Sequence, residues 1–290
     1  MVGRNSIRSA EQVVHDHLEV SENVVNELLL ICSVIGSTDD DGAFIPVTDC
    51  LNWLQDLQRA LRRDDDTTRT IALLLGSWQV VQTKLLPIVL ACQYDSALVM
   101  TVVKLLVILT KPLSGGAQKA AKLVLDVKRS KSKKQPITKA YMKEHRRLKE
   151  NALNQAKRLI EYKRSFVDSK HAGVLKIFVS LLTEPLARTG SSRTEADHMT
   201  IELVLHLFRN LLSAGHVQTD RHEDNRLHQQ MVALFESELV LDIIMVLGQE
   251  IEARENQHYN LLIMEILHYL FRDQVRKDTN YCATTEHHVV

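Results

Sequence analysis

Apolar residues recur every three or four positions through most of the chain, which is the spacing that places them on one side of an α-helix. Residues 48–63 illustrate the pattern with leucines at 51, 54, 57 and 61. Thr48 or Asp49 can accept the free amide protons of the first turn. The pattern therefore predicts a helix that buries its leucine side.

The same spacing predicts further helices, separated by segments rich in Gly, Pro, Ser and Asp. They cover residues 70–92, 96–110, 171–183, 195–213, 226–247 and 250–272. Pro87 lies inside the first of these and lacks an amide proton, so we expect a kink or a new helix beginning near Lys84. No strand alternation competes with the helical interpretation.

Several predicted helices are apolar on more than one side. TVVKLLVIL at 101–109 and LVLDIIMVL at 239–247 leave almost no polar stripe, so each must be covered on several faces. Helical pairs about 40 residues long, stacked in layers, would provide that cover. The predicted fold is all-α, an armadillo/HEAT-like α-solenoid of stacked helical pairs with a basic loop-plus-helix insertion. A compact multi-helix domain is the alternative.

Composition agrees with an interior built from aliphatic side chains. Apolar residues make up 45% of the 290 and aromatic residues 5%. The longest apolar run, 97–110, is interrupted by Lys104 and is shorter than the roughly 20 residues needed to cross a bilayer. The first twenty residues hold charges and no apolar stretch, so we expect no secretory signal and no membrane association. The four cysteines are far apart, which predicts reduced core thiols rather than disulfides.

The cations are unevenly distributed, although Lys+Arg and Asp+Glu both total 36. From Lys128 to Arg164, fourteen Lys and Arg stand against three Glu, a net charge of +11. Residues 127–140 are rich in Ser and Lys with little to bury, which predicts a mobile basic loop. The apolar residues that follow, from Tyr141 to Leu159, have helical spacing. They predict a helix that docks on one side and shows cations on the other.

Such a surface suits phosphate groups, because each neutralised phosphate releases condensed counterions. The predicted nucleic-acid contacts are Lys128, Arg129, Lys131, Lys133, Lys134, Lys139, Lys143, Arg146 and Arg147. Since few aromatic residues are interleaved, contact with the backbone of a duplex is favoured over stacking on single-stranded bases. A solvated loop and a nuclear import signal are the alternatives.

The candidate motifs for catalysis or metal binding are incomplete. STDDDG at 37–42 has Ser37 in the first position of a calcium loop and Thr48 where a bidentate Glu should close it. SGGAQKAAK at 114–122 lacks the second glycine and the Lys-Ser/Thr pair of a phosphate-binding loop. His222 and His228 lie six positions apart, outside the spacing of two ligands on one helical face. We expect no catalytic residues, no cofactor and no metal site.

Three stretches, in this order and at these distances, resemble the N-terminal domain of the Timeless proteins. They are LLGSWQVVQTKLLPIVL at 74–90, ELVLHLFRNLLSA at 202–214 and LLIMEILHYLFRDQ at 261–274. DCLNWLQDLQRALRRDDDTTR at 49–69 supports the resemblance, which covers roughly 24–275. We expect a polar extension over 1–20, a Timeless-like α-solenoid over 21–275 and a disordered tail over 276–290.

The resemblance implies a non-catalytic scaffold of the DNA replication fork in the nucleus. Such a protein associates with a Tipin-like protein and the MCM-containing replicative helicase and contacts duplex DNA. It supports fork stability, pausing and checkpoint signalling. A circadian branch of the family shares the domain and binds a clock partner. A nuclear protein-interaction module without direct DNA contact is therefore the alternative.

Five polar residues match the family's recurring polar positions beside apolar helical rows. They are Arg209, Asn210, Arg272, Asp273 and Gln274. They form either a surface for a partner protein or hydrogen bonds between helices. The structural interpretation is favoured, because a planar guanidinium can bind several free carbonyls at the end of a helix.

Overall fold

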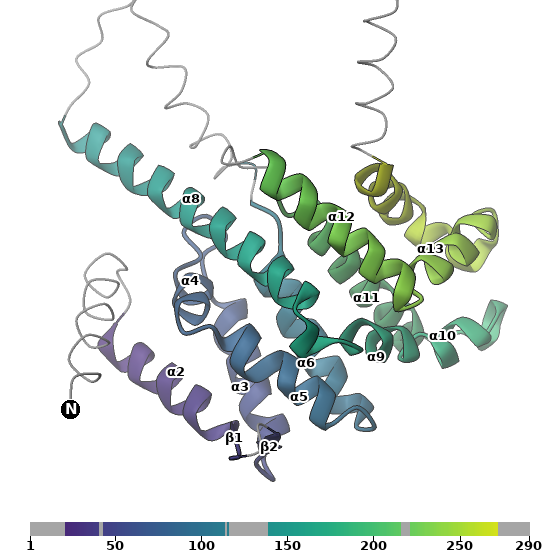
Figure 1. The fold of residues 1–290 in the computed structure, drawn as a ribbon, viewed down its shortest axis with the longest axis horizontal. Helices are drawn as coiled ribbons and strands as arrows, with labels where there is room; N and C mark the ends of the chain where they lie inside the picture. The colour runs from purple at the N-terminus through teal and green to yellow at the C-terminus, as the bar shows by residue number, and fades with distance from the viewer. Residues whose placement is uncertain (1–20, 41–42, 114, 116–138, 216–220, 272–290) are drawn as a thin grey trace, which may run out of the picture. The chain divides into compact units, whose positions relative to one another are not determined.

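The computed structural model describes residues 21–40, 43–113, 115, 139–215 and 221–271, with only the backbone described at 139–145 and 221–224. The described chain is helical apart from one short hairpin (Figure 1), which confirms the all-α fold. The solenoid arrangement of the helices remains a prediction. The chain divides into two compact units, Met1–Glu161 and Tyr162–Val290.

Five α-helices and the two strands of a hairpin are described between residues 22 and 110 of the first unit. They are α2 (Glu22–Val34), β1 (Gly36–Thr38), β2 (Phe44–Pro46), α3 (Cys50–Arg62), α4 (Thr70–Ser77), α5 (Leu86–Ala91) and α6 (Ser96–Thr110). Helix α3 packs against both α2 and α6, and α5 packs against β2 and α6. Every leucine of the predicted side of α3 except Leu51 is buried. The amphipathic pattern of α3 therefore places it between two neighbours.

The hairpin was not expected from the sequence. Strands β1 and β2 are antiparallel, with Gly36 opposite Pro46 and Thr38 opposite Phe44. A Cβ atom at Gly36 would stand 2.6 Å from the carbonyl oxygen of Ile45, so only glycine fits this close approach. Three residues per strand are too few to show alternation. Residues 37–40 of the acidic stretch belong to this hairpin, and residues 41 and 42 lie outside the described residues.

The break in the predicted helical run 70–92 lies earlier than predicted. Helix α4 ends at Ser77, Gln79 has a left-handed φ of 55°, and a π-helical turn at Val81–Leu85 leads into α5. The two segments meet at an angle of 62°. Pro87 occupies the first turn of α5, where a missing amide proton costs nothing. The proline thus marks a helix start, and the chain bends ahead of it.

The second unit holds a series of helices joined by short turns. They are α9 (Val174–Ser180), α10 (Thr183–Ala187), α11 (Glu195–Ser213), α12 (Arg221–Ser237), α13 (Val240–Gln249) and a last helix at 260–271. Three 3₁₀ turns also occur, at Ser169–His171, Gly190–Ser192 and Arg254–Tyr259. Helix α10 packs against α11, and α13 packs against both α9 and α12.

Two predicted helices of this unit are interrupted, and the predicted helix 250–272 begins only at residue 260, after the 3₁₀ turn Arg254–Tyr259. The predicted helix 226–247 is interrupted at Leu239, whose φ is 66°. Next to it, the buried carboxylate of Glu238 accepts hydrogen bonds from the amides of Gly173 (2.6 Å) and Lys176 (3.0 Å) at the start of α9. This contact between distant segments fixes the turn between α12 and α13. The predicted helix 171–183 is likewise divided between α9 and α10.

Helix α8 (Lys139–Val167) is the longest described helix and crosses the division between the two units after Glu161. It begins in the segment that the sequence marks as strongly basic. The predicted mobile loop 127–140 precedes it and lies outside the described residues, apart from the backbone at 139 and 140.

Candidate nucleic-acid interface

Helix α8 has one buried side and one solvent-facing side, as its pattern predicts. Ala152, Gln155, Ala156 and Leu159 are buried. In the part of α8 that belongs to the first unit, the exposed side carries the cations Arg146, Lys149 and Lys157, with the exposed acid Glu150 among them. We call these three cations the α8 cationic face. It presents several positive charges and little negative charge to solvent.

A polar side chain on the buried side attaches α8 to the first unit. The amide nitrogen Nε2 of Gln155 donates hydrogen bonds to the carbonyl oxygens of Thr67 (3.0 Å) and Thr68 (3.2 Å). Both carbonyls belong to the turn between α3 and α4. A one-position rotation of α8 would bury a charged residue and lose both bonds. Gln155 therefore fixes which side of the helix faces solvent.

The turn that receives Gln155 is itself organised by two carboxylates. Asp65 accepts hydrogen bonds from the amides of Thr67 (2.9 Å) and Thr68 (2.8 Å), and Asp64 accepts one from the amide of Ala72 (2.8 Å). The bonds from Thr68 and Thr67 hold the pKa of Asp65 below its ordinary value. Asp64 thereby satisfies an amide of the first turn of α4, so this acidic run forms the turn and caps the helix.

Arg69 completes the turn and joins it to the end of α6. Its guanidinium donates to the carbonyl oxygens of Lys111 (2.8 Å) and Ile108 and lies 3.5 Å from that of Leu109. Its backbone is left-handed, with φ 47° and ψ 48°. The side chain is only 6% exposed. Arg69 thus satisfies carbonyls that the last turn of a helix leaves open. Sequence reasoning missed it.

The predicted contact residues are only partly placed by the structure. Lys128, Arg129, Lys131, Lys133 and Lys134 lie outside the described residues, and at Lys139 and Lys143 only the backbone of α8 is described. Arg146 is exposed and Arg147 is half-buried. The α8 cationic face adds Lys149 and Lys157 to the predicted set. These two belong to the basic segment but were not among the predicted contacts.

Two cations of the basic segment are bound by other groups of the chain. Arg158 forms an ion pair with Glu161 at 2.6 Å. Lys163 is 1% exposed, and its Nζ donates to the carbonyl oxygen of Ala214 at 3.0 Å, at the end of α11. The ring atom Nδ1 of His228 lies 3.4 Å from the same Nζ. Lys163 therefore stabilises the second unit from within, which its sequence neighbours gave no sign of.

The predicted polar positions of α11 lie where neighbouring helices meet. Arg209 approaches His206 Nδ1 at 3.0 Å and Glu265 at 3.5 Å, and Asn210 is 2% exposed. Arg272, Asp273 and Gln274 lie outside the described residues. The contacts of Arg209 join α11 to the last helix, and a role of either residue toward a partner remains a prediction.

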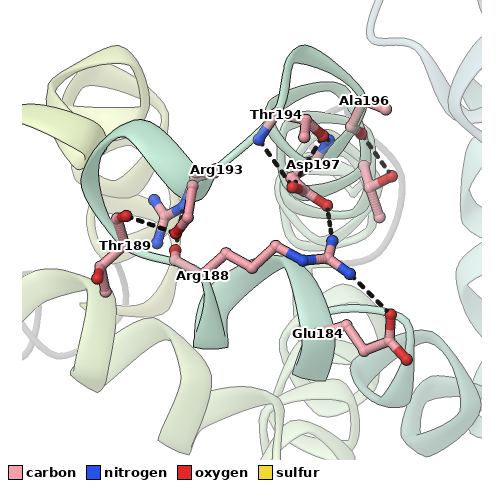
Figure 2. Close-up of polar contacts among 9 residues, drawn as sticks. Glu184, Arg188, Thr189, Arg193, Thr194, Ala196 and Asp197 are labelled. Carbon is pink, nitrogen blue, oxygen red and sulfur yellow. Dashed lines mark hydrogen bonds and ion pairs between the residues drawn. The ribbon is translucent and has the colours of Figure 1, made fainter.

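A polar network fixes the start of α11 (Figure 2). Arg188 donates to Asp197 at 2.5 Å and to Glu184 at 3.1 Å, while Arg193 Nε donates to the carbonyl oxygen of Arg188 at 3.0 Å. Asp197 and Thr194 form a reciprocal capping box. The Thr194 amide, more than the Arg188 charge, holds the pKa of Asp197 below its ordinary value. These contacts stabilise the second unit and include no reactive arrangement.

In the part of the chain that the structure describes, no group of three His, Cys, Asp or Glu side chains could hold a metal ion. Among the same residues, no single helix is long and apolar enough to cross a membrane. Helix α4 and the segment Val81–Ala91 pass that test together, by length and composition, despite their bend of 62°.

Comparisons with known proteins agree on one family. A model of the family described as Timeless protein matches residues 44–280. The human "Protein timeless homolog" is 29% identical over 254 residues, covering 86% of this chain and 18% of that protein. "Mating-type switching protein swi1" of Schizosaccharomyces pombe is 28% identical over 258 residues, covering 83% of this chain and 22% of that protein.

A third relative is "Topoisomerase 1-associated factor 1" of Cryptococcus neoformans, 25% identical over 253 residues, covering 82% of this chain and 21% of that protein. The chain therefore spans about a fifth of the length of the curated relatives it matches.

Proposed function

Because the chain belongs to the Timeless family, we propose that it is a non-catalytic helical scaffold of the DNA replication fork that contacts duplex DNA through phosphates. The family resemblance supports the fork, and the name of one relative associates that relative with topoisomerase 1. On this proposal the protein acts in the nucleus with a Tipin-like protein and the replicative helicase. The observation that carries the DNA contact is the α8 cationic face.

The length of the α8 cationic face suits a duplex. From Arg146 to Lys157 the helix advances about 17 Å, at roughly 1.5 Å per residue. That span matches about 5 base pairs, since phosphates on one strand of B-DNA recur every 3.4 Å or so along the axis. Three exposed cations spread over such a length can meet successive phosphates, and the basic segment that precedes α8 in the sequence adds further positive charge.

The chemistry of this face predicts affinity without sequence preference. Lysine ammonium groups act as point charges toward phosphate. Asn and Gln side chains can recognise base edges, and Asn154 is the one such side chain exposed among the described side chains of α8. Binding through phosphates weakens steeply with salt. We therefore expect similar affinity for unrelated duplexes of equal length.

The test compares three charge-reversal variants of the full chain on a fluorescent 30-base-pair duplex. The helix variant carries Arg146→Glu, Lys149→Glu and Lys157→Glu, and the loop variant carries Lys131→Glu, Lys133→Glu and Lys134→Glu. The control reverses three exposed cations of other elements, Arg63, Lys176 and Arg254. At 50 mM salt each phosphate that is no longer neutralised should weaken binding about tenfold, so the helix variant should bind at least 100-fold more weakly.

Circular dichroism of each variant confirms that the helical fold is retained. If the helix variant binds as tightly as the control, α8 is not part of the interface. If the intact chain binds no duplex at 50 mM salt, the proposed DNA contact is wrong. In the second case, nuclear accumulation of a reporter fused to residues 126–136 would favour the interaction-module alternative, in which the basic loop serves nuclear import.

A further inference from the structure

Six consecutive residues between α10 and α11 are exposed to solvent. They are residues 187–192, with the sequence ARTGSS. The chain turns at Gly190, whose φ of 55° is left-handed, and forms the 3₁₀ turn Gly190–Ser192. The backbone hydrogen bonds that the amides of Ser192 and Arg193 donate in this turn are 3.2 and 3.3 Å long. Because these bonds are few and exposed, a second macromolecule can reach this segment and straighten it.

Ser191 differs from the neighbouring hydroxyl residues. The hydroxyl of Ser192 donates to the carbonyl oxygen of Thr189 at 2.7 Å, and that of Thr194 belongs to the capping box of α11. Ser191 is exposed and takes part in neither contact. A group attached to the Ser191 hydroxyl therefore leaves both contacts intact.

An arginine stands three positions before Ser191. Ser191 is the only one of the described Ser and Thr residues that follows a Lys or Arg at this spacing. Many Ser/Thr kinases bind such a cation through acidic residues of their substrate groove, in a charge pattern that selects the substrate. The side chain of Arg188 is 42% exposed and pairs with the carboxylates of Glu184 and Asp197. The acidic groove of a kinase offers this guanidinium partners of the same kind.

We propose that Ser191 is phosphorylated by a Ser/Thr kinase that recognises arginine three residues before its acceptor, and that the phosphate loosens the turn Arg254–Tyr259 from the start of α11. In this reaction the kinase transfers the γ-phosphoryl group of ATP to Oγ of Ser191. An oxygen–phosphorus bond forms at Ser191, and the bond between the γ-phosphorus and the oxygen of the leaving ADP breaks. The hydroxyl proton passes to the catalytic Asp of the kinase.

A carboxylate of the turn Arg254–Tyr259 lies next to the acceptor. The amide of Gly190, the residue before Ser191, is 3.4 Å from Oε1 of Glu255. The amide of Glu255 itself and then that of Gly190 hold the pKa of Glu255 below its ordinary value, so this carboxylate is ionised at neutral pH. A phosphoserine carries about −1.5 to −2 charges at pH 7. Because like charges repel, the phosphate disfavours the contact between Glu255 and Gly190.

The cations nearest in the sequence are already bound within the chain. Arg188 pairs with Glu184 at 3.1 Å and with Asp197 at 2.5 Å (Figure 2). Arg193 is 7% exposed, and its Nε donates to the carbonyl oxygen of Arg188 at 3.0 Å. Neither guanidinium can bind the phosphate without losing bonds that it now makes. Repulsion of Glu255 is therefore the main effect of the phosphate.

The first test incubates the full chain with MgATP and the catalytic domain of calcium/calmodulin-dependent protein kinase, which prefers arginine at this spacing. Peptide mass spectrometry follows each site. Ser132, three positions after Arg129 and outside the described residues, is the internal reference. Ser191 should be phosphorylated at a rate within about tenfold of Ser132, and Ser192, which lacks this arginine, about tenfold more slowly than Ser191.

Arg188→Gln should slow phosphorylation of Ser191 about tenfold and leave the rate at Ser132 unchanged, because only the first site loses its cation. Circular dichroism checks the fold of this variant. If the variant does not fold, a synthetic peptide of residues 184–196, with and without the same change, provides the comparison. The site assignment is wrong if Ser132 is phosphorylated and Ser191 is not, if Ser191 and Ser192 react equally, or if Arg188→Gln has no effect on Ser191.

Hydrogen exchange of the amides of residues 254–259 tests the effect of the phosphate. Exchange should be about threefold faster in the phosphorylated chain than in Ser191→Ala treated with the same kinase, because a weaker contact opens more often. The Ser191→Ala chain carries the same phosphates at other sites. In a Glu255→Gln background the difference should disappear, since the amide has no charge for the phosphate to repel. An unchanged exchange rate, or an equal increase with Glu255→Gln, would contradict the loosening. No DNA takes part, so the outcome is independent of the proposed role of α8.

Discussion

Replacing Arg69 tests whether the turn between α3 and α4 holds the first unit together. Its guanidinium makes two hydrogen bonds to carbonyls at the end of α6, those of Lys111 and Ile108, in an almost fully buried position. A hydrogen bond from a charged group contributes about 1.5–3 kcal/mol. Since water can reach the freed carbonyls in part, Arg69→Ala should lower the free energy of unfolding by about 2–4 kcal/mol.

Because the backbone of Arg69 is left-handed, two substitutions can distinguish the contribution of its side chain to stability from that of its backbone conformation. A left-handed conformation costs a non-glycine residue about 1–2 kcal/mol. Arg69→Gly removes the same hydrogen bonds but relieves this cost, so it should be about 1 kcal/mol more stable than Arg69→Ala. The exposed neighbour Arg63, changed to Ala, provides the control and should stay within about 0.5 kcal/mol of the parent chain.

Urea denaturation followed by tryptophan fluorescence measures these differences, because both tryptophans of the chain, Trp53 and Trp78, lie in the first unit. The dependence of the unfolding free energy on urea should be unchanged. If Arg69→Ala matched the Arg63→Ala control, or if Arg69→Ala were more stable than Arg69→Gly, the reasoning about this turn would be refuted.

Three further predictions concern thiols, pH and a helix junction. Burial raises the pKa of Cys32 and of Cys50 to about 11, so iodoacetamide at pH 8 should leave both unmodified in the folded chain and alkylate both in urea, as peptide mass spectrometry would show. The pKa of Asp65 is lowered in the folded chain, so its charge stabilises the fold above the ordinary Asp pKa of about 3.9 and this contribution is lost as pH falls below that value. The stability difference between the parent chain and Asp65→Asn should therefore shrink from pH 6 to pH 2.5 in urea titrations, and a constant difference would contradict the assignment. Leu239→Gly should not destabilise the α12–α13 junction and should raise the midpoint of thermal unfolding slightly, since Leu239 is exposed and left-handed; a fall of several degrees would show that the leucine side chain is needed.

Local signals sufficed for some helices and failed for others. The bounds of α6 and α11 match the predicted 96–110 and 195–213. Each of these helices has an aliphatic side, and polar residues at its two ends mark where it begins and ends. The turn at Leu239 could not be predicted in this way. It is fixed by Glu238, whose partners Gly173 and Lys176 are more than sixty residues away in the sequence.

The candidate interface shows the same division. The two-sided character of α8 follows from its sequence, so the exposed cations near Arg146 could be expected. The sequence could not show which cations are bound within the chain. Lys163 binds the carbonyl oxygen of Ala214, and Arg158 pairs with Glu161. Gln155 and Arg69 were missed for a related reason: each binds carbonyl oxygens far along the chain, and a carbonyl leaves no mark in a sequence pattern.

The salt dependence of duplex binding tests the central claim most directly. For the intact chain, the logarithm of the association constant should fall linearly with the logarithm of salt concentration, by about 0.9 for each phosphate contacted. Neutralising three cations with Arg146→Gln, Lys149→Gln and Lys157→Gln should make that slope shallower by about 2.7. An unchanged slope in this variant would contradict the claim that the exposed side of α8 contacts the DNA backbone.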